Sequence, residues 1–217
     1  MLIFFYFYEK SKMIESSLIY NKFLDYIDKI TPLTSDERDI FLRKIMIKEY
    51  KKGEIIIQEG VKSNYIYFIH KGIVRNFIHQ NNKTINFRSE GMTVTGYSTY
   101  NYDQGFKSKM NVECLEDCTF IMIPVDTIHY VVENFEYGDR LGRFLAEKHV
   151  LELVDLIIDI DCRSIMERYH DLSIKYPNIH QRVSQHFIAS FLGTTPVHLS
   201  RLKTKDNSNK MIATSVK

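Results

Sequence analysis

The stretch KGEIIIQEGVKSNYIYFIHKGIVR, residues 52–75, decides the fold class of this chain. Its runs of Ile, Tyr, Phe and Val are short and are separated by single glycines and polar turn residues, a pattern that predicts β-strands. The same pattern continues to Pro124. Many short strands with turn-sized gaps predict an all-β sandwich or barrel. The clearest strand candidates are residues 54–58, 65–70, 73–79, 84–89, 109–114 and 119–123.

Helical patterns flank this β region on both sides. Residues 14–48 repeat with a helical period, and Thr34–Asp36 with Glu37 form an N-terminal capping signal. After the β region, Asp126 is expected to cap a short helix that runs through Val132. Two more helices are expected over residues 137–161 and 164–175, the second ended by Tyr176-Pro177.

The helix expected over residues 137–161 has too many apolar positions for one buried face. One face can rest on the β domain while another meets a second helix. A homodimer through residues 137–161 uses both faces, and burial of a single helix within a monomer is the alternative that the sequence leaves open. The apolar positions are Leu141, Phe144, Leu145, Leu151, Leu153, Val154, Leu156, Ile157, Ile158 and Ile160.

The stretch from Arg182 to Lys203 predicts a helix-turn-helix. Ser184 is a good N-cap for a helix over residues 185–192, which Gly193 can end because it tolerates positive φ. Thr195-Pro196 then starts a second helix, with threonine as the cap and proline in the first turn. The side chains expected to form the small core are Phe187, Ile188, Ala189, Phe191, Leu192, Leu199 and Leu202.

The opposite face of the second helix has the composition of a helix that lies in the major groove of DNA. Arg201 is the first candidate for reading a base, because its planar guanidinium can donate two hydrogen bonds to guanine. Val197 and Pro196 offer only apolar contact. Phosphate contacts suit Ser184, Gln185, His198, Lys203 and Lys205, and Thr195 and Ser200 complete the predicted DNA-binding set.

The charge distribution agrees with this prediction better than the total charge does. The formal net charge is only +2, but the residues from Arg182 to the end carry +5 and the rest of the chain −3. A basic terminal segment is either a solvated tail or a surface that binds a polyanion. A helix-turn-helix in the same segment favours the second interpretation.

Other classes of protein receive little support. Cys114, Cys118 and Cys162 are too few for a disulfide framework and contain no Cys-x-x-Cys pair, so we expect free thiols and no metal site. Met1–Tyr8 is apolar but lacks the features of a signal peptide and is too short to span a membrane. Whether Met1 or Met13 is the start stays open. No nucleophile–base pair, paired carboxylates or P-loop is present, so no enzyme is predicted.

The combined features resemble the Crp/Fnr family of transcription regulators. Residues 52–56, 59–60 and 65–75 are similar to the opening strands of that family, residues 112–118 to the end of its effector segment, and residues 183–202 to its DNA-reading motif. The resemblance implies an α+β fold: a jelly-roll-like β-roll (a double-stranded β-helix) that is cyclic-nucleotide-binding-like, a long dimerisation helix and a C-terminal helix-turn-helix domain. The implied divisions are residues 1–136, 137–161 and 162–217.

The resemblance weakens at the effector pocket. Members that bind cyclic AMP carry a glutamate for the ribose and an arginine followed by a serine or threonine for the cyclic phosphate. Ser98, near Gly96, stands at the glutamate position here, and Ser108 and Lys109 stand at the other two. Lysine has no bidentate guanidinium, so we predict a degenerate pocket that does not respond to cyclic AMP. The aromatic run Tyr97, Tyr100, Tyr102 and Phe106 either closes this pocket or lines a site for an uncharged ligand.

Two other features of the family are doubtful here. No cysteine precedes Cys114, which argues against an iron–sulfur cluster, whereas haem bound through His70 or His79 stays open. Residues 207–209 can form a turn and residues 211–214 a short strand, but no partner strand is evident. The wing that normally follows the recognition helix is therefore expected to be reduced or absent.

The sequence thus predicts a cytoplasmic, homodimeric transcription regulator that binds a palindromic site in double-stranded DNA, needs no cofactor and has an unidentified small-molecule effector if it has one. The alternative is a ligand-binding or scaffold protein that keeps the β-roll and has lost specific DNA binding.

Overall fold

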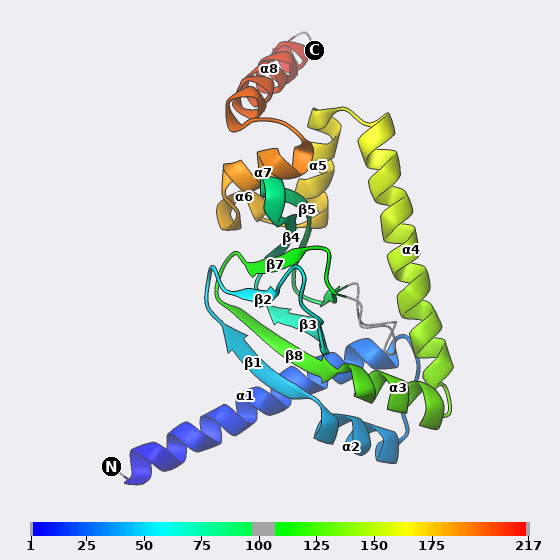
Figure 1. Cartoon of the computed structure of the whole chain (residues 1–217). Coiled ribbons are helices and arrows are strands. Elements are labelled where there is room, and N and C mark those ends of the chain that lie inside the picture. The colour runs from blue at the N-terminus through cyan, green and yellow to red at the C-terminus, as the bar shows by residue number, and fades with distance from the viewer. Residues whose placement is uncertain (1, 97–106, 216–217) are drawn as a thin grey trace.

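A computed structural model describes residues 2–96 and 107–215, with side chains for residues 13–96, 107–206 and 208. Two helices, a β-roll, a long helix and a C-terminal helical unit follow one another along the chain (Figure 1). The helices before the roll are α1 (Leu2–Asp28) and α2 (Ser35–Lys44). Thr34 caps α2 with a complete capping box to Glu37, as the sequence predicted.

The roll consists of two four-stranded antiparallel sheets, with strand orders β1-β8-β3-β6 and β2-β7-β4-β5. The predicted α+β class with a jelly-roll-like domain is confirmed. The short 3-10 helix η1 (His79–Asn81) joins β4 to β5. The strands are β1 (Met46–Tyr50), β2 (Ile55–Ile57), β3 (Tyr65–Lys71), β4 (Val74–Ile78), β5 (Lys83–Arg88), β6 (Thr93–Val94), β7 (Asn111–Cys114) and β8 (Cys118–Pro124).

Strand β1 corrects the prediction that helix extends to residue 48. Met46–Tyr50 pairs residue by residue with β8, from Met46 opposite Met122 to Tyr50 opposite Cys118. Each pairing satisfies backbone groups of both strands, which outweighs a helical pattern read from side chains alone. Strand β6 is only two residues long and left no detectable pattern in the sequence.

Two buried clusters hold the roll and its N-terminal helices. The first fills the space between the two sheets and includes Val74, Val112 and Phe120. The second lies under the helices, where the ring of Phe23 meets the ring of Phe68 edge-on at a centroid distance of 4.9 Å. Helices α1 and α2 are therefore parts of the roll domain and not separate appendages.

The helices after the roll largely follow the predicted boundaries. They are α3 (Val125–Asn134), α4 (Gly138–Cys162), α5 (Ile165–Lys175), α6 (Ile179–Arg182), α7 (Gln185–Leu192) and α8 (Pro196–Ser215). The prediction that Asp126 caps α3 is wrong, because Pro124 occupies the N-cap position and Asp126 lies in the first turn. None of the helices in the described part of the chain is long and apolar enough to span a membrane.

The C-terminal end also differs from the predicted turn and strand. Helix α8 continues without interruption through residues 207–209 and 211–214 to Ser215, so both of those predictions are wrong. No strand follows the second helix of the motif within the described residues. The expectation of a reduced or absent wing agrees with this helix.

The C-terminal helical unit shares a buried core with the roll. Ile73, Phe87 and Leu115 of the roll lie in one cluster with Tyr176 and Ile179, together with the core of the helix-turn-helix. The division of the chain into residues 1–136, 137–161 and 162–217 stays a prediction. The cluster places the C-terminal helices directly against the sheet that contains β4 and β5.

Candidate nucleic-acid interface and ligand cavity

Local capping sets the geometry of the helix-turn-helix. Ser184 accepts a hydrogen bond from the backbone N–H of Phe187 at the start of α7, and Gly193 ends that helix with φ of +74°. Thr195 Oγ1 accepts a hydrogen bond of 3.2 Å from the N–H of His198 at the start of α8. All three capping predictions are confirmed. The expected core is mostly confirmed, with Ile188, Ala189, Leu192 and Leu199 buried and Phe187, Phe191 and Leu202 half-buried.

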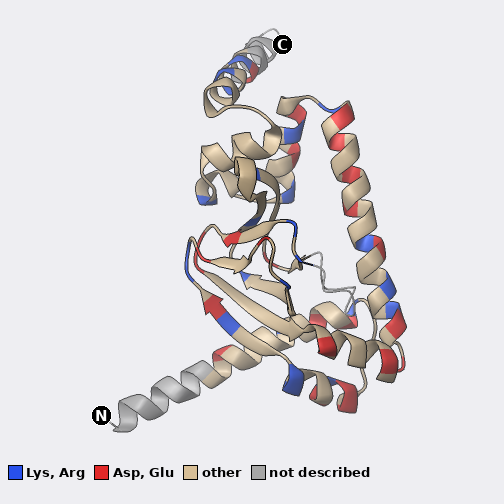
Figure 2. Cartoon of the chain, in the orientation of Figure 1, with Lys and Arg blue, Asp and Glu red and all other residues tan. Residues whose placement is uncertain are grey.

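The predicted base-reading side chain lies on an open surface. Arg201 is exposed and makes no hydrogen bond or ion pair with the described residues. Val197 is 62% exposed beside it. Helix α8 projects away from the roll, and its Lys and Arg residues lie on this projecting part (Figures 1 and 2). Of the other predicted DNA-binding residues, Ser184, Gln185, Thr195, His198, Ser200 and Lys205 are exposed and Pro196 is half-buried.

Lys203 is less available than the other predicted contacts. Its side chain is half-buried, and its Nζ lies 5.3 Å from the ring centroid of Tyr169 on α5. An ammonium over an aromatic face is a cation–π contact. Lys203 therefore belongs partly to the packing between α8 and α5.

Arg182 does not contribute to the exposed basic surface, although the charge count began with it. The guanidinium forms ion pairs with Glu90, at 2.6 Å, and with Glu116, both on the roll. Its charge is thereby neutralised, and the charge excess available to a polyanion is smaller than the sequence suggested. Arg182 instead ties the C-terminal unit to the roll.

Four further contacts attach helix α7 and its neighbours to β4 and β5. The Lys83 ammonium donates to the carbonyl of Ser190, and Ser190 Oγ accepts a 3.0 Å hydrogen bond from the N–H of Thr84. The guanidinium of Arg75 stacks on the ring of Phe187 at 3.8 Å. Tyr176 donates from its hydroxyl to the carbonyl of Phe87 at 2.5 Å, and burial raises the pKa of this phenol to about 12.

Replacing Arg182 by glutamine is expected to lower the urea midpoint at pH 7 and to flatten its acid dependence. Burial on its own raises the pKa of Glu90, but hydrogen bonds from Arg182 and from the N–H of Gly72 hold it below its ordinary value of 4.5. Such a carboxylate stabilises the fold above its unfolded-state pKa and loses this contribution as the pH falls through the folded-state value. Urea unfolding at neutral pH and below about pH 4.5 measures the effect.

The matched control for this prediction is Arg163→Gln. Arg163 also has two carboxylate partners, Asp159 and Asp171, but they lie on α4 and α5 and not on the roll, and its side chain is 45% exposed. We expect a smaller change in its urea midpoint, because exposed ion pairs contribute little. If Arg182→Gln retains the acid dependence of the unsubstituted protein, the ion pairs of Arg182 do not stabilise the attachment.

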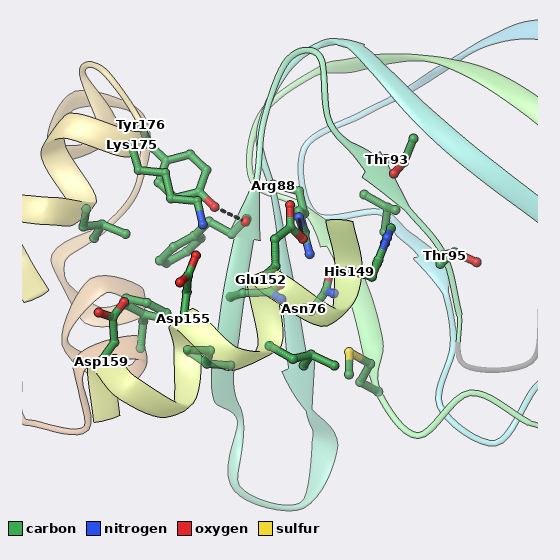
Figure 3. A pocket seen from close by; sticks show the side chains of 18 of the residues that line it. Asn76, Arg88, Thr93, Thr95, His149, Glu152, Asp155, Asp159, Lys175 and Tyr176 are labelled. Atoms are coloured by element: carbon green, nitrogen blue, oxygen red, sulfur yellow. Dashed lines mark hydrogen bonds and ion pairs between the residues drawn. The ribbon is translucent and has the colours of Figure 1, made fainter. Parts of the chain in front are cut away.

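A cavity of about 400 Å³ lies between the roll, α4 and the C-terminal unit. Strands β4 and β5 supply one wall, α4 supplies the wall opposite, and α5 closes one end (Figure 3). Phe191 of α7 also lines the cavity. The C-terminal half of α4 is acidic along this side (Figure 2). Across the cavity, Arg88 and Glu152 form an ion pair of 2.6 Å.

The structure describes three of the four residues predicted for the effector pocket. Gly96 lines the cavity, whereas Ser108 is buried with its hydroxyl donating to the carbonyl of Met110 at 2.6 Å. Gly96 and Ser108 are neighbours, because a Cβ built on Gly96 would lie 3.6 Å from the Ser108 Cβ. Lys109 is exposed and is not among the described residues that line the cavity. Ser98 and the aromatic run 97–106 lie outside the described residues.

Sequence reasoning missed the polar residues that line the cavity. Asn76 and Asn86 lie opposite each other on β4 and β5, and His149 and Glu152 reach the cavity from α4. A partial signal existed in β4, where Asn76 shares its face with the buried Val74, whereas Asn86 shares its face of β5 with Arg88. Their convergence with α4 depends on tertiary packing and has no local signature.

The residues proposed for haem ligation do not meet this cavity. His70 is half-buried at the end of β3, His79 is exposed, and neither is among the described residues that line the cavity. The described residues contain no cluster of three His, Cys, Asp or Glu side chains suited to a metal ion. Cys114 and Cys118 are buried free thiols, and Cys162 is an exposed one.

Comparisons with known proteins agree with this architecture. Residues 47–135 match the family described as the cyclic nucleotide-binding domain. No curated protein sequence matches the chain. At the low identities found among solved structures, similarity concerns the fold alone.

Three of the similar structures illustrate this. FixK2 from Bradyrhizobium japonicum is 15% identical, with a TM-score of 0.63 over 76% of this chain and 86% of that one. A protein from Eubacterium rectale, described as a transcriptional regulator of the Crp/Fnr family, is 14% identical, with a TM-score of 0.63 over 85% and 88% of the two chains. A cyclic nucleotide-binding domain containing protein from Listeria monocytogenes EGD-e is 16% identical, with a TM-score of 0.60 over 86% and 89%.

Proposed function

We propose that this protein, in which residues 47–135 match the cyclic nucleotide-binding domain within a Crp/Fnr-like fold, is a homodimeric, sequence-specific DNA-binding transcription regulator. The observation that carries the proposal is the exposed start of α8, with Arg201 free of contacts among the described residues on a motif whose helix caps and buried core are complete. A guanidinium presented in this way can read guanine in the major groove. Cytoplasmic localisation belongs to the same proposal.

The homodimer is supported by the surface of α4. Apolar side chains stay exposed along this helix, which is unusual for a surface that faces water. Two such helices placed side by side would bury them and would set two recognition helices on a palindromic site. The exposed residues are Phe144, Val150, Leu151, Leu153, Val154, Ile157, Ile158 and Ile160.

A response to cyclic AMP is not part of the proposal. Ser108 uses its hydroxyl within its own turn, and Lys109 points its charge to solvent and not to the cavity. A cyclic phosphate needs charge-assisted donors at these positions. Any effector is therefore proposed to be of another chemical class.

Arg201→Ala is expected to reduce affinity for the preferred DNA sequence by about 10- to 100-fold for each of the two half-sites, since one bidentate base contact contributes roughly 1–3 kcal/mol. Affinity for unrelated DNA should change little. The measurement is a gel-shift titration at fixed salt, on a duplex that the unsubstituted protein selects from a random pool and on a scrambled duplex.

Lys205→Ala is the matched control for Arg201→Ala. Its side chain is exposed on the same helix but is assigned to phosphate, so its loss should weaken binding to both duplexes equally and reduce the salt dependence. Failure of the unsubstituted protein to prefer any sequence would contradict the proposal. It would support the alternative, a ligand-binding or scaffold protein that has lost specific DNA binding.

A further inference from the structure

Two asparagine side chains in the cavity have unused hydrogen-bonding capacity. Asn76 and Asn86 are directly paired across β4 and β5, and both line the cavity. Asn76 is only 7% exposed, and the Oδ1 atoms of both residues are buried with no hydrogen-bond partner among the described residues. A buried polar group without a partner destabilises a fold, so nearly all such groups in proteins are satisfied. Two carboxamides side by side in one cavity therefore indicate a ligand.

The charged groups around the cavity are largely committed to each other. Arg88 pairs with Glu152 at 2.6 Å, and the terminal nitrogens of Arg168 donate to the carbonyls of Phe191 and Leu192. The lining contains four carboxylates (Glu152, Asp155, Asp159 and Asp171) against three Lys and Arg side chains (Arg88, Arg168 and Lys175). Outside the lining, Arg163 pairs with two of these carboxylates, Asp159 and Asp171, so acid and base are nearly balanced around the cavity. The Nε of Arg168 is buried without a hydrogen-bond partner among the described residues. Neutral ligands are favoured.

The remaining wall is apolar and partly aromatic. Phe87 and Phe191 lie with their ring centroids 5.5 Å apart at the end of the cavity that adjoins α7, and Val94, Met110 and Leu153 contribute aliphatic surface. A volume of about 400 Å³ lies within the range of ordinary small-molecule sites. A planar ring with one polar edge fits both the wall and the asparagine pair.

We propose that this cavity binds an uncharged, planar molecule with a carboxamide or lactam edge, which hydrogen-bonds to the side chains of Asn76 and Asn86. An amide edge presents a donor and an acceptor next to each other, as a carboxamide side chain does, so the two are complementary. A carboxylate of the same shape offers acceptors only, so it cannot donate to the unpartnered Oδ1 atoms, and it adds an unbalanced charge to the cavity. The ligand class is thus distinguished from a cyclic phosphate by hydrogen bonding and by charge.

The same ligand would control the DNA-reading unit, a consequence that rests on the proposed function. Arg75 precedes Asn76 on β4 and points to the other face of the sheet, where it stacks on Phe187 of α7. Phe191 of α7 itself lines the cavity. A molecule held by Asn76 therefore touches the roll and the helix-turn-helix together and would favour the docked arrangement of the two.

The test measures binding of benzamide, 2-pyridone, benzoate and cyclic AMP to the full chain by ligand-observed NMR, without DNA. Benzamide and 2-pyridone are expected to bind, and benzoate and cyclic AMP at least about tenfold more weakly. Asn76→Leu and, separately, Asn86→Leu should each weaken benzamide binding about tenfold, because each removes one hydrogen bond to the ligand. Equal binding of benzamide and benzoate, no amide binding, or benzamide binding unchanged in both variants would overturn the inference.

Thermal unfolding separates the proposed role from a merely structural one. Asn111 is buried in the same sheet, but its Oδ1 accepts a 2.9 Å hydrogen bond from the N–H of Glu59. Asn111→Leu should therefore lower the melting temperature, whereas Asn76→Leu should leave it unchanged or raise it. A loss of stability in Asn76→Leu like that in Asn111→Leu would assign Asn76 to the fold and overturn its role in binding.

The DNA gel-shift assay keeps the two proposals apart. Benzamide binding that depends on Asn76, in a protein with no DNA preference, supports the cavity inference and removes the proposed function. A DNA preference without binding of benzamide or 2-pyridone supports the proposed function and removes the cavity inference. If the protein shows both a DNA preference and benzamide binding, benzamide at saturating concentration should change the affinity for DNA. An unchanged affinity would contradict only the proposed control of DNA binding by the ligand.

Discussion

Replacing both Leu151 and Val154 by glutamate is expected to give a monomer whose affinity for DNA is lower by at least about 100-fold. The two side chains are 64% and 45% exposed on α4. In a dimer they would be buried, and two charges placed there would have to lose their hydration without a partner. A monomer also loses the gain from binding two half-sites at once, which is roughly 100-fold or more. Sedimentation velocity and a gel shift on the selected duplex measure both effects.

Ile174→Glu is the control for this substitution. Ile174 is 78% exposed on α5, away from the apolar surface of α4, so the same change in chemistry should leave the oligomeric state intact. A dimer that persists in the Leu151→Glu, Val154→Glu protein would refute pairing through α4. A dimer lost in both the double variant and Ile174→Glu would indicate a general effect of added negative charge.

Gly72→Ala is expected to destabilise the folded state by about 3 kcal/mol, through steric overlap and an unfavourable backbone conformation. Gly72 has φ of +110°, and a Cβ built on it would lie 2.4 Å from Cys118 Sγ and 2.9 Å from the Cys118 Cα. The second contact is with backbone, which cannot turn aside. Urea unfolding at neutral pH measures the loss.

Gly53→Ala separates the two causes. Gly53 also has positive φ, +87°, but nothing lies within 4 Å of a Cβ built there. We expect a loss of only about 1 kcal/mol, from the backbone conformation alone. Equal losses for the two variants would mean that the close contact with Cys118 relaxes without cost.

The features that depend on neighbouring residues were predicted well. Ser184 and Gly193 determine where α7 begins and ends and Thr195-Pro196 where α8 begins, since helix caps satisfy backbone groups within a few residues. The strands of the roll were predicted from alternating apolar positions between glycines, which are also signals within a short stretch of chain. Strand β1 was missed because its partner, β8, lies about seventy residues further along the chain.

The candidate sites divide in a similar way. The exposure of Arg201 follows from helical periodicity, because Leu199 and Leu202 face the small core and Arg201 faces away from it. The roles of Arg182 and Lys203 did not follow, since their partners Glu90, Glu116 and Tyr169 come from other elements. Composition gives the charge of both residues but not the ion pairs of Arg182 or the aromatic contact of Lys203.

The sequence by itself therefore determined the order of the parts, a β-roll, a long helix and a helix-turn-helix, because each rests on periodicity and capping within a short stretch of chain. Only the tertiary structure decided how these parts act on each other. It moved Arg182 from the predicted basic surface to the roll, and it brought Asn76 and Asn86 together beside α4. Ion pairs and cavities join residues far apart in the chain, so no local pattern specifies them.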